Sequence, residues 1–154
     1  MRKALFAGSF DPFTLGHESI VSRALDIADE VVIGIGINAG KKSMFSVEQR
    51  IEMINTLYNN EPRVSVVAYN GLTTDFAESI EASFLVRGVR SSTDFEFEKN
   101  IADVNRKLTG LETVLFITEN IYSCISSSIV RELLSYGKDV SDFLPEGINI
   151  KDVR

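Results

Sequence analysis

Five short apolar segments, separated by stretches with helical periodicity, constrain the fold of this chain more than any other feature of its sequence. The segments are rich in Val, Ile, Leu and Phe, and they lie at residues 3–7, 30–37, 63–68, 83–86 and 113–118. Their apolar residues are nearly continuous rather than alternating, which is typical of strands covered on both faces. The sequence therefore predicts five buried strands of a parallel sheet.

Amphipathic helices are expected between these strands. Apolar residues recur at helical spacing in four stretches, at residues 20–28, 47–57, 97–108 and 129–134. Ser46 with Gln49 has the spacing of a capping box, Thr93 with Glu96 is expected to cap the third helix, and Gly137 to end the last one. Strands that alternate with helices form right-handed βαβ units, so we expect an α/β fold: a Rossmann-like, doubly wound, five-stranded parallel sheet with helices on both faces.

Length, cysteine content and charge narrow the class of protein. The 154 residues are expected to form one domain, residues 1–154, and no apolar run is long enough to span a membrane. The single cysteine, Cys124, cannot form an internal disulfide, which favours a reducing cytoplasm. Sixteen basic and 22 acidic side chains give a net charge of −6, which argues against nucleic acid or membrane partners. A phosphorylated ligand would therefore need a local cluster of positive groups.

The segment after the first strand carries the most specific motif. It reads G-x-F-D-P-x-x-x-G-H, from Gly8 to His17, and contains the only histidine of the chain. Parallel sheets bind ligands beyond the carboxyl ends of their strands, and a helix N-terminus attracts phosphate. His17 is expected where the first helix begins, so a phosphate site is favoured over a simple turn.

Three further segments that follow predicted strands carry groups suited to phosphate. Lys41 and Lys42 follow the second strand. The fourth is followed by Arg87-Gly88-Val89-Arg90, in which the arginines either bind phosphate or pair with Asp94, Glu96 or Glu98. After the fifth come three serines, 126–128, which either cap the last helix or bind phosphate with spare hydroxyl and N–H groups. Four such segments at one sheet edge indicate a nucleoside triphosphate and a phosphorylated co-substrate.

The segment around His17 resembles the signature of the nucleotidyltransferase superfamily. Together with K-K-S-M-F, R-G-V-R, D-F-E-F-E and I-S-S-S-I-V-R-E, it is most similar to the phosphopantetheine adenylyltransferases, over about residues 2–145. The chain departs from that family at Ser43, where proline is common, and in the loop at residues 118–123. The resemblance implies transfer of the adenylyl group of ATP to 4′-phosphopantetheine by direct in-line attack on the α-phosphate, giving dephospho-coenzyme A and pyrophosphate.

The same resemblance assigns roles to individual residues. It implies catalytic roles for His17, Lys41, Arg90 and Ser128, with His17 stabilising the transition state. It implies a second group that binds phosphopantetheine: Ser9, Lys41, Thr73 and Arg87. It also implies an ATP-binding group: Ser9, Phe10, His17, Gly88, Val89, Arg90, Glu98, Tyr122, Ser123, Cys124, Ile125, Ser126, Ser127 and Ser128.

Cofactor, assembly and two alternatives complete the expectations. Mg²⁺ should accompany ATP, bound mainly by phosphate oxygens and water, because the sequence offers no carboxylate cage for a metal. A homohexamer and feedback binding of coenzyme A are implied by the resemblance alone. One alternative is another small nucleotidyltransferase, for nicotinamide mononucleotide or with CTP. The other is a non-catalytic nucleotide-binding module.

Overall fold

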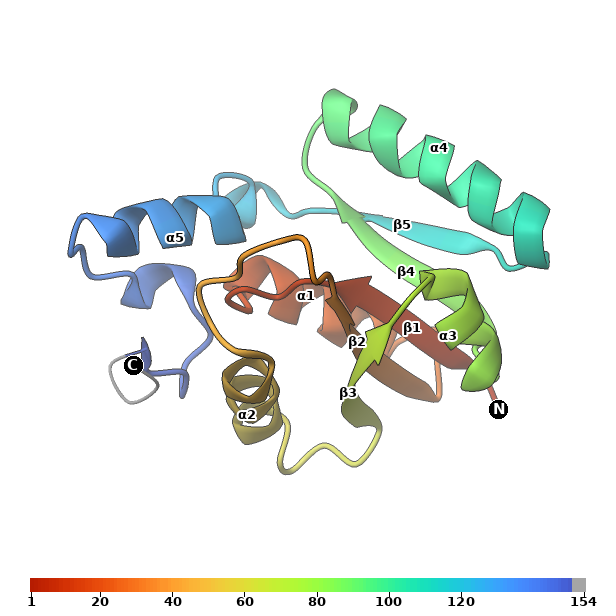
Figure 1. Cartoon of the computed structure of the whole chain (residues 1–154), viewed down its shortest axis with the longest axis horizontal. Helices are drawn as coiled ribbons and strands as arrows, with labels where there is room; N and C mark the ends of the chain where they lie inside the picture. The colour runs from red at the N-terminus through yellow and green to blue at the C-terminus, as the bar shows by residue number, and fades with distance from the viewer. Residues whose placement is uncertain (151–154) are drawn as a thin grey trace.

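The computed structural model describes residues 1–150, and its centre is a five-stranded parallel sheet (Figure 1). The strand order is β3-β2-β1-β4-β5. The strands are β1 (Lys3–Gly8), β2 (Glu30–Ile37), β3 (Val64–Asn70), β4 (Phe84–Val89) and β5 (Thr113–Ile117). The chain runs outward from β1 to one edge and returns to build the other half beside β1, so the order reverses between β1 and β4. The predicted doubly wound sheet is confirmed.

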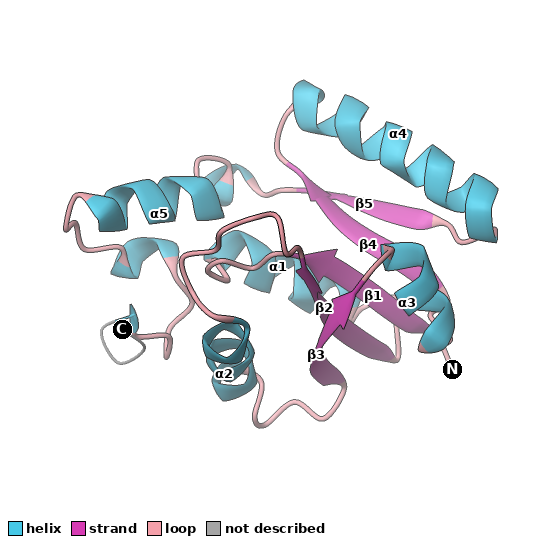
Figure 2. Cartoon of the chain, viewed as in Figure 1, coloured by secondary structure: helices cyan, strands magenta, loops and turns pink. Residues whose placement is uncertain are grey.

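Helices cover both faces of the sheet, as expected (Figure 2). They are α1 (Leu15–Ala24), α2 (Val47–Leu57), α3 (Thr73–Ser79), α4 (Ser92–Thr109) and α5 (Ser127–Ser135). One core cluster joins α1 and α2 to one face, through Phe6, Ile20, Ile33, Ile54 and Val86. A second cluster joins α3 to the opposite face, through Leu5, Val32, Ala77 and Leu85. Neighbouring strand residues point to opposite faces, which is why the apolar runs are continuous.

The last helix lies outside these two layers. Residues of α5 pack with Phe45, Met53 and the segment after α5 in a third small core. Gly137 adopts a left-handed φ of +72° just beyond α5, and the N–H of Lys138 donates to the carbonyl of Leu133. This is the expected glycine stop.

Several predicted bounds differ from the structure, and two of these differences change the reading of named residues. The third of the four helices expected from the sequence is α4. Its cap is Ser91, whose side chain accepts the N–H of Asp94, and not Thr93 with Glu96, because α4 begins at Ser92. The fourth strand runs to Val89, so Arg87 and Gly88 lie on the strand rather than after it. The polar Arg87 interrupted the apolar run that marked the strand. The final residues of the expected domain, 151–154, lie outside the described part of the chain.

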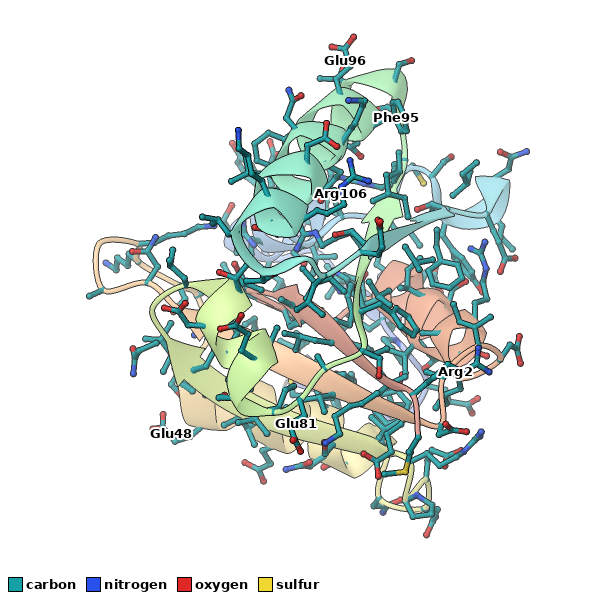
Figure 3. All side chains as sticks on the ribbon, turned by 90° about the vertical axis from the view of Figure 1, so that its right-hand side faces the viewer. Arg2, Glu48, Glu81, Phe95, Glu96 and Arg106 are labelled. Carbon is teal, nitrogen blue, oxygen red and sulfur yellow. The ribbon has the colours of Figure 1, made fainter. Side chains whose placement is uncertain are left out.

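The apolar stripe of α4 does not pack against the sheet as a buried helix face would. Phe97, Val104 and Leu108 are 62%, 55% and 63% exposed. Figure 3 shows Phe95 and Glu96 at the end of α4 that projects farthest from the sheet. Apolar periodicity identified the helix correctly, but the stripe faces a cavity and solvent.

Candidate active site

A groove of about 300 Å³ opens at the carboxyl ends of β1 and β4, and all four segments predicted to bind phosphate line it. Most of the predicted site residues take part. They are Ser9, Phe10, His17, Lys41, Arg87, Gly88, Arg90, Glu98, Ile125, Ser126, Ser127 and Ser128.

Five predicted residues lie elsewhere. Val89 is buried because its side chain faces the core, and Tyr122 belongs to a short 3-10 turn outside the groove. Ser123 and Cys124, next to that turn, are exposed to solvent. Thr73 lines a second cavity, described below. Contacts of these residues with a nucleotide or its co-substrate remain predictions.

His17 is held by the first turn of its own helix. It is the third residue of α1, and the backbone N–H of Thr14 donates to its Nδ1 at 3.0 Å, while the Thr14 side chain caps the helix by accepting the N–H of His17. Since a backbone N–H can only donate, Nδ1 must be the acceptor and Nε2 must carry the proton. Local capping therefore fixes both the tautomer and the direction of the ring.

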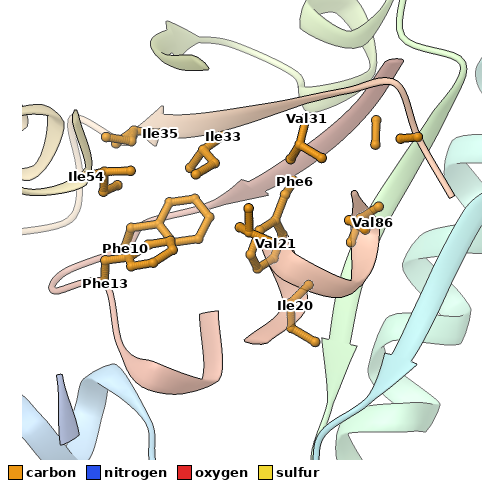
Figure 4. Close-up of a cluster of buried hydrophobic side chains, with 13 residues drawn as sticks. Phe6, Phe10, Phe13, Ile20, Val21, Val31, Ile33, Ile35, Ile54 and Val86 are labelled. Atoms are coloured by element: carbon orange, nitrogen blue, oxygen red, sulfur yellow. The ribbon is translucent and has the colours of Figure 1, made fainter. Parts of the chain in front are cut away.

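Aromatic rings surround the imidazole on its inner side. Phe6, Phe10 and Phe13, all drawn in Figure 4, have ring centroids 6.0, 5.0 and 5.3 Å from that of His17. Burial, assisted by the nearby positive charges of Arg87 and Arg90, lowers the pKa of His17 from 6.5 to about 3. His17 is therefore a neutral hydrogen-bond donor at pH 7. Phe10 is nearly buried and meets the His17 ring in a T-shaped arrangement, so little of its side chain is open to the groove.

Lys41 lies on an exposed loop between β2 and α2 and reaches the groove, whereas Lys42 does not line it. Within residues 1–150, no carboxylate lies within ion-pair distance of the Lys41 ammonium. The structure thus distinguishes the two adjacent lysines, and Lys41 is the one available to an anion in the groove.

The guanidinium of Arg87 is held from two sides. Its Nε and Nη2 donate to the two carboxylate oxygens of Glu98 at 2.8 and 2.7 Å, and its Nη1 donates to the carbonyl of Ala7 at 2.6 Å. Glu98 is almost fully buried, as expected for a bidentate pair. Glu98 is therefore the ion-pair partner of Arg87 in this structure. Such pairing is the alternative to phosphate binding that the sequence leaves open for this arginine.

The serine run divides into different roles. Ser126 is the N-cap of α5 and accepts the N–H of Ile129, so the capping interpretation holds for its hydroxyl. The hydroxyl of Ser127 donates to the carbonyl of Pro12 at 2.8 Å, and Ser128 accepts from Arg131 at 3.2 Å. In these bonds Ser126 and Ser128 only accept, so Ser127 alone of the three uses its O–H, and the expected contact of spare hydroxyls with phosphate remains a prediction. The first-turn N–H groups of α5 still have no acceptor within the helix.

The groove is positive although the chain is acidic. Four cationic side chains line it, Lys41, Arg87, Arg90 and Arg131, against the two carboxylates of Asp94 and Glu98. Each carboxylate is paired with an arginine, Asp94 with Arg90 at 3.5 Å and Glu98 with Arg87. The surplus positive charge is the local cluster that a phosphorylated ligand requires.

A second cavity, of about 350 Å³, lies between α3, α4 and the sheet. Its walls are mainly apolar, with Leu72, Ile101, Val104 and Leu108 among them, and it also contains Thr73. Ala7, Arg87 and Glu98 line both cavities. The Arg87–Glu98 pair is thus the partition between a polar groove and an apolar one.

Four polar residues that line the groove were not among the predicted site residues: Thr14, Asp94, Thr118 and Arg131. Arg131 could have been found, because it follows Ser127 and Ser128 by one helical turn and so shares their face. Thr14 has the N-cap spacing to His17. The apolar cavity could not be read from the sequence, because it depends on how α4 is set against α3.

Residues 1–150 hold neither a ready-made metal site nor a membrane-spanning helix. No group of three or more His, Cys, Asp or Glu side chains within residues 1–150 is arranged to hold a metal ion. Over the same residues, none of the helices has the length and apolar content needed to cross a bilayer.

Sequence comparison shows which known proteins this chain resembles. A sequence model of the cytidylyltransferase-like family matches residues 5–133. Proteins named phosphopantetheine adenylyltransferase are 57% identical in Bacteroides thetaiotaomicron and 60% identical in Phocaeicola vulgatus, each over 97% of this chain and 99% of the relative. That of Lachnoclostridium phytofermentans is 47% identical over 96% of this chain and 91% of its own length.

Proposed function

This chain belongs to the phosphopantetheine adenylyltransferase family, and we propose that it transfers the adenylyl group of ATP to 4′-phosphopantetheine, giving dephospho-coenzyme A and pyrophosphate. The observation that carries the choice of acceptor is the pair of adjoining cavities. A positive groove suits the reacting phosphates, and the apolar cavity beyond Arg87 and Glu98 suits a long, weakly polar arm attached to one of them. Nicotinamide mononucleotide and glycerol 3-phosphate have no such arm.

The chemistry requires positioning rather than a general base. A phosphate monoester has a second pKa near 6, so the acceptor is largely a dianion at pH 7 and is itself the nucleophile. One of its oxygens forms a bond to the α-phosphorus of ATP while the bond from that phosphorus to the β-phosphate bridging oxygen breaks. Pyrophosphate leaves with the electron pair of the broken bond, and no enzyme group is covalently modified.

His17 would donate its Nε2–H to an oxygen of the α-phosphoryl group. Charge builds on that group in the transition state, so a donor fixed in place before the reaction lowers the barrier. The bond between Thr14 N–H and Nδ1 supports this role, because it leaves Nε2 as the protonated nitrogen.

Charged and hydroxyl groups would hold the two phosphates in line. Lys41 would orient the acceptor phosphate, with Arg87 beside it, and Ser9, which also lines the groove, would contact both ligands. Arg90 and Ser128 would bind the leaving pyrophosphate near the N-terminus of α5. The remaining predicted ATP contacts, including Glu98 and Tyr122, belong to the same proposal.

Mg²⁺ would arrive as part of the substrate MgATP. The groove does not fit a resident metal, because both of its carboxylates are paired with arginines. Phosphate oxygens and water would supply the ligands of the ion.

Three broader expectations of the family resemblance are part of this proposal. A homohexamer, supported by the exposed apolar side chains of α4, would have six times the chain mass of 17.1 kDa in light scattering. Coenzyme A, which shares its pantetheine arm with the product, would compete for the same cavities. The enzyme would work in the cytoplasm, where ATP is made and where a free thiol such as Cys124 stays reduced.

Pyrophosphate release by the purified protein tests the function. The assay would combine MgATP in turn with 4′-phosphopantetheine, nicotinamide mononucleotide and glycerol 3-phosphate, with MgCTP replacing MgATP as a control. We expect release only with MgATP and phosphopantetheine. Release with another pair would overturn the acceptor assignment, and MgATP binding without release in any mixture would favour a non-catalytic module.

A further inference from the structure

Asp11, the acidic residue of the G-x-F-D-P motif, is buried and does not line the groove. Its side chain is 4% exposed. Its Oδ2 accepts the backbone N–H of Met44 at 2.8 Å, and its Oδ1 accepts the backbone N–H of Phe45 at 2.9 Å. A buried carboxylate is tolerated when both oxygens are hydrogen-bonded. The charge of Asp11 is therefore used to hold a loop that lies more than thirty residues away in sequence.

That loop carries Lys41. Residues 37–44 are exposed, and the next residue, Phe45, is buried in the small core that includes Val130. Because the loop itself is exposed, the position of Lys41 depends on where the two ends of the loop are attached. One end is the last residue of β2, and the other is the pair of amides bound by Asp11.

The backbone around Asp11 extends the same connection to α5. The carbonyl of Asp11 accepts from Arg131 at 2.8 Å, and the carbonyl of Pro12 accepts the hydroxyl of Ser127 at 2.8 Å. The segment at residues 11–12 thus contacts both α5 and the loop at residues 37–44, called the lysine loop below. The same segment continues along the chain directly to His17.

A buried positive charge, that of Arg50, independently joins the loop after β1 to the residues just beyond the lysine loop. Arg50 is 4% exposed, and its Nη1 donates to the carbonyl of Ser9 at 2.7 Å. Its Nε donates to the carbonyl of Ser46, just beyond the lysine loop, at 3.3 Å. Two buried charges that each bind backbone groups of these loops indicate that their relative position matters.

We infer that Asp11 is a positioning residue for adenylyl transfer: its carboxylate fixes the lysine loop so that Lys41 lies opposite His17 across the groove. The inference rests on the proposed function. Asp11 does not act on the substrates directly, because both of its oxygens bind backbone amides and it lies outside the groove. Its effect on the reaction must therefore pass through Lys41.

A double-mutant cycle tests this dependence. Asp11→Asn keeps the size of the side chain but leaves one oxygen for two amides. We expect it to lower kcat/KM for phosphopantetheine about tenfold or more in the wild-type background, and less than about threefold in a Lys41→Ala background. The Kd of MgATP should change by less than about threefold, because the acceptor side of the groove is the part displaced. Asp29→Asn is the matched control, since Asp29 also binds a backbone N–H, that of Arg2, but at the opposite end of the sheet.

Hydrogen exchange supplies a readout that does not depend on activity. In Asp11→Asn, the amides of Met44 and Phe45 should exchange about tenfold faster or more, while the amides of β1 and β2 keep their protection. If Asp11→Asn does not fold, Met44→Pro removes one of the two N–H donors from the other end and carries the same test.

Each outcome decides the inference. Loss in the double variant equal to the product of the two single losses, or unchanged exchange at residues 44 and 45, would overturn it. If the wild-type protein releases no pyrophosphate with MgATP and phosphopantetheine, both the proposed function and this inference fail. If the wild-type protein is active but the two single fold-losses multiply in the double variant, the role of Asp11 is refuted and the proposed function stands.

Discussion

The low pKa of His17 makes the stability of the protein depend on pH in a way that one substitution should remove. His17→Gln is the informative variant. Glutamine is a preferred residue at the third position of a capped helix, where it can reach back to the N–H of Thr14 as His17 does. The variant therefore keeps the helix cap and deletes the titrating group. His17 is the only histidine of the chain, so no other imidazole contributes.

The size of the effect follows from the two pKa values. The pKa is 6.5 in the unfolded chain and about 3 in the folded one, so between these values the unfolded state binds more protons. Stability is full above pH 6.5 and falls as the pH drops toward 3. At pH 5 the unfolded imidazole is almost fully protonated and the folded one is neutral, which lowers the free energy of unfolding by about 2 kcal/mol relative to pH 8. This figure hardly changes for any folded pKa below about 4.

Urea unfolding at pH 8 and pH 5 measures this difference. The chain has no tryptophan, so far-UV circular dichroism at a fixed protein concentration is the suitable signal. The wild type should lose about 2 kcal/mol more than His17→Gln over this pH range. Burial raises the pKa of Glu18, which acts in the opposite sense, but it does so in both variants and cancels in the comparison. Equal pH dependence in the two proteins, or an imidazole proton resonance that titrates near pH 6.5 in the folded protein, would refute the reasoning.

Three further predictions concern catalysis and packing. His17→Ala should lower kcat by about a hundredfold or more with little change in the Kd of MgATP, because the donor serves the transition state; equal loss in both would reduce His17 to a binding residue. Arg87→Ala should mainly raise the KM for phosphopantetheine, and an effect confined to ATP would contradict its assignment to the acceptor side. Gly34→Ala would bring a Cβ within 2.9 Å of the Leu5 side chain and 3.1 Å of Tyr69, so thermal unfolding should show a loss of about 1–3 kcal/mol. Gly40→Ala, whose Cβ meets no atom closer than 3.5 Å, is the control and should change stability by less than about 0.5 kcal/mol.

Sequence reasoning succeeded where local rules decide the structure. Apolar runs identified all five strands, and the central strands β1 and β2 are covered on both faces as expected. The expectation of two covered faces is wrong for the edge strand β3, where Ser65 and Val67 are exposed. Ser46 and Gln49 form the predicted capping box. The position of His17 at the start of α1 also followed from its local sequence.

The parts that failed depend on tertiary contacts. Arg87 is polar and so seemed to follow its strand, yet Glu98 from α4 and the carbonyl of Ala7 satisfy it within the sheet. The bonds of Ser127 to Pro12 and of Asp11 to Phe45 join residues far apart in sequence, and no periodic pattern records them. The apolar stripe of α4 predicted a buried face, but its partner is a cavity.

The stereochemical course at the α-phosphorus tests the central claim most directly, namely that the groove holds both phosphates for a single direct displacement. The substrate would be an α-thiotriphosphate of adenosine, chiral at phosphorus through sulfur and ¹⁸O, reacting with 4′-phosphopantetheine. The configuration of the product would be read by ³¹P NMR. Inversion is the result expected from direct attack by the acceptor phosphate. Retention would contradict the account, because it requires two displacements and a covalent adenylyl intermediate on a residue of the groove such as Ser128.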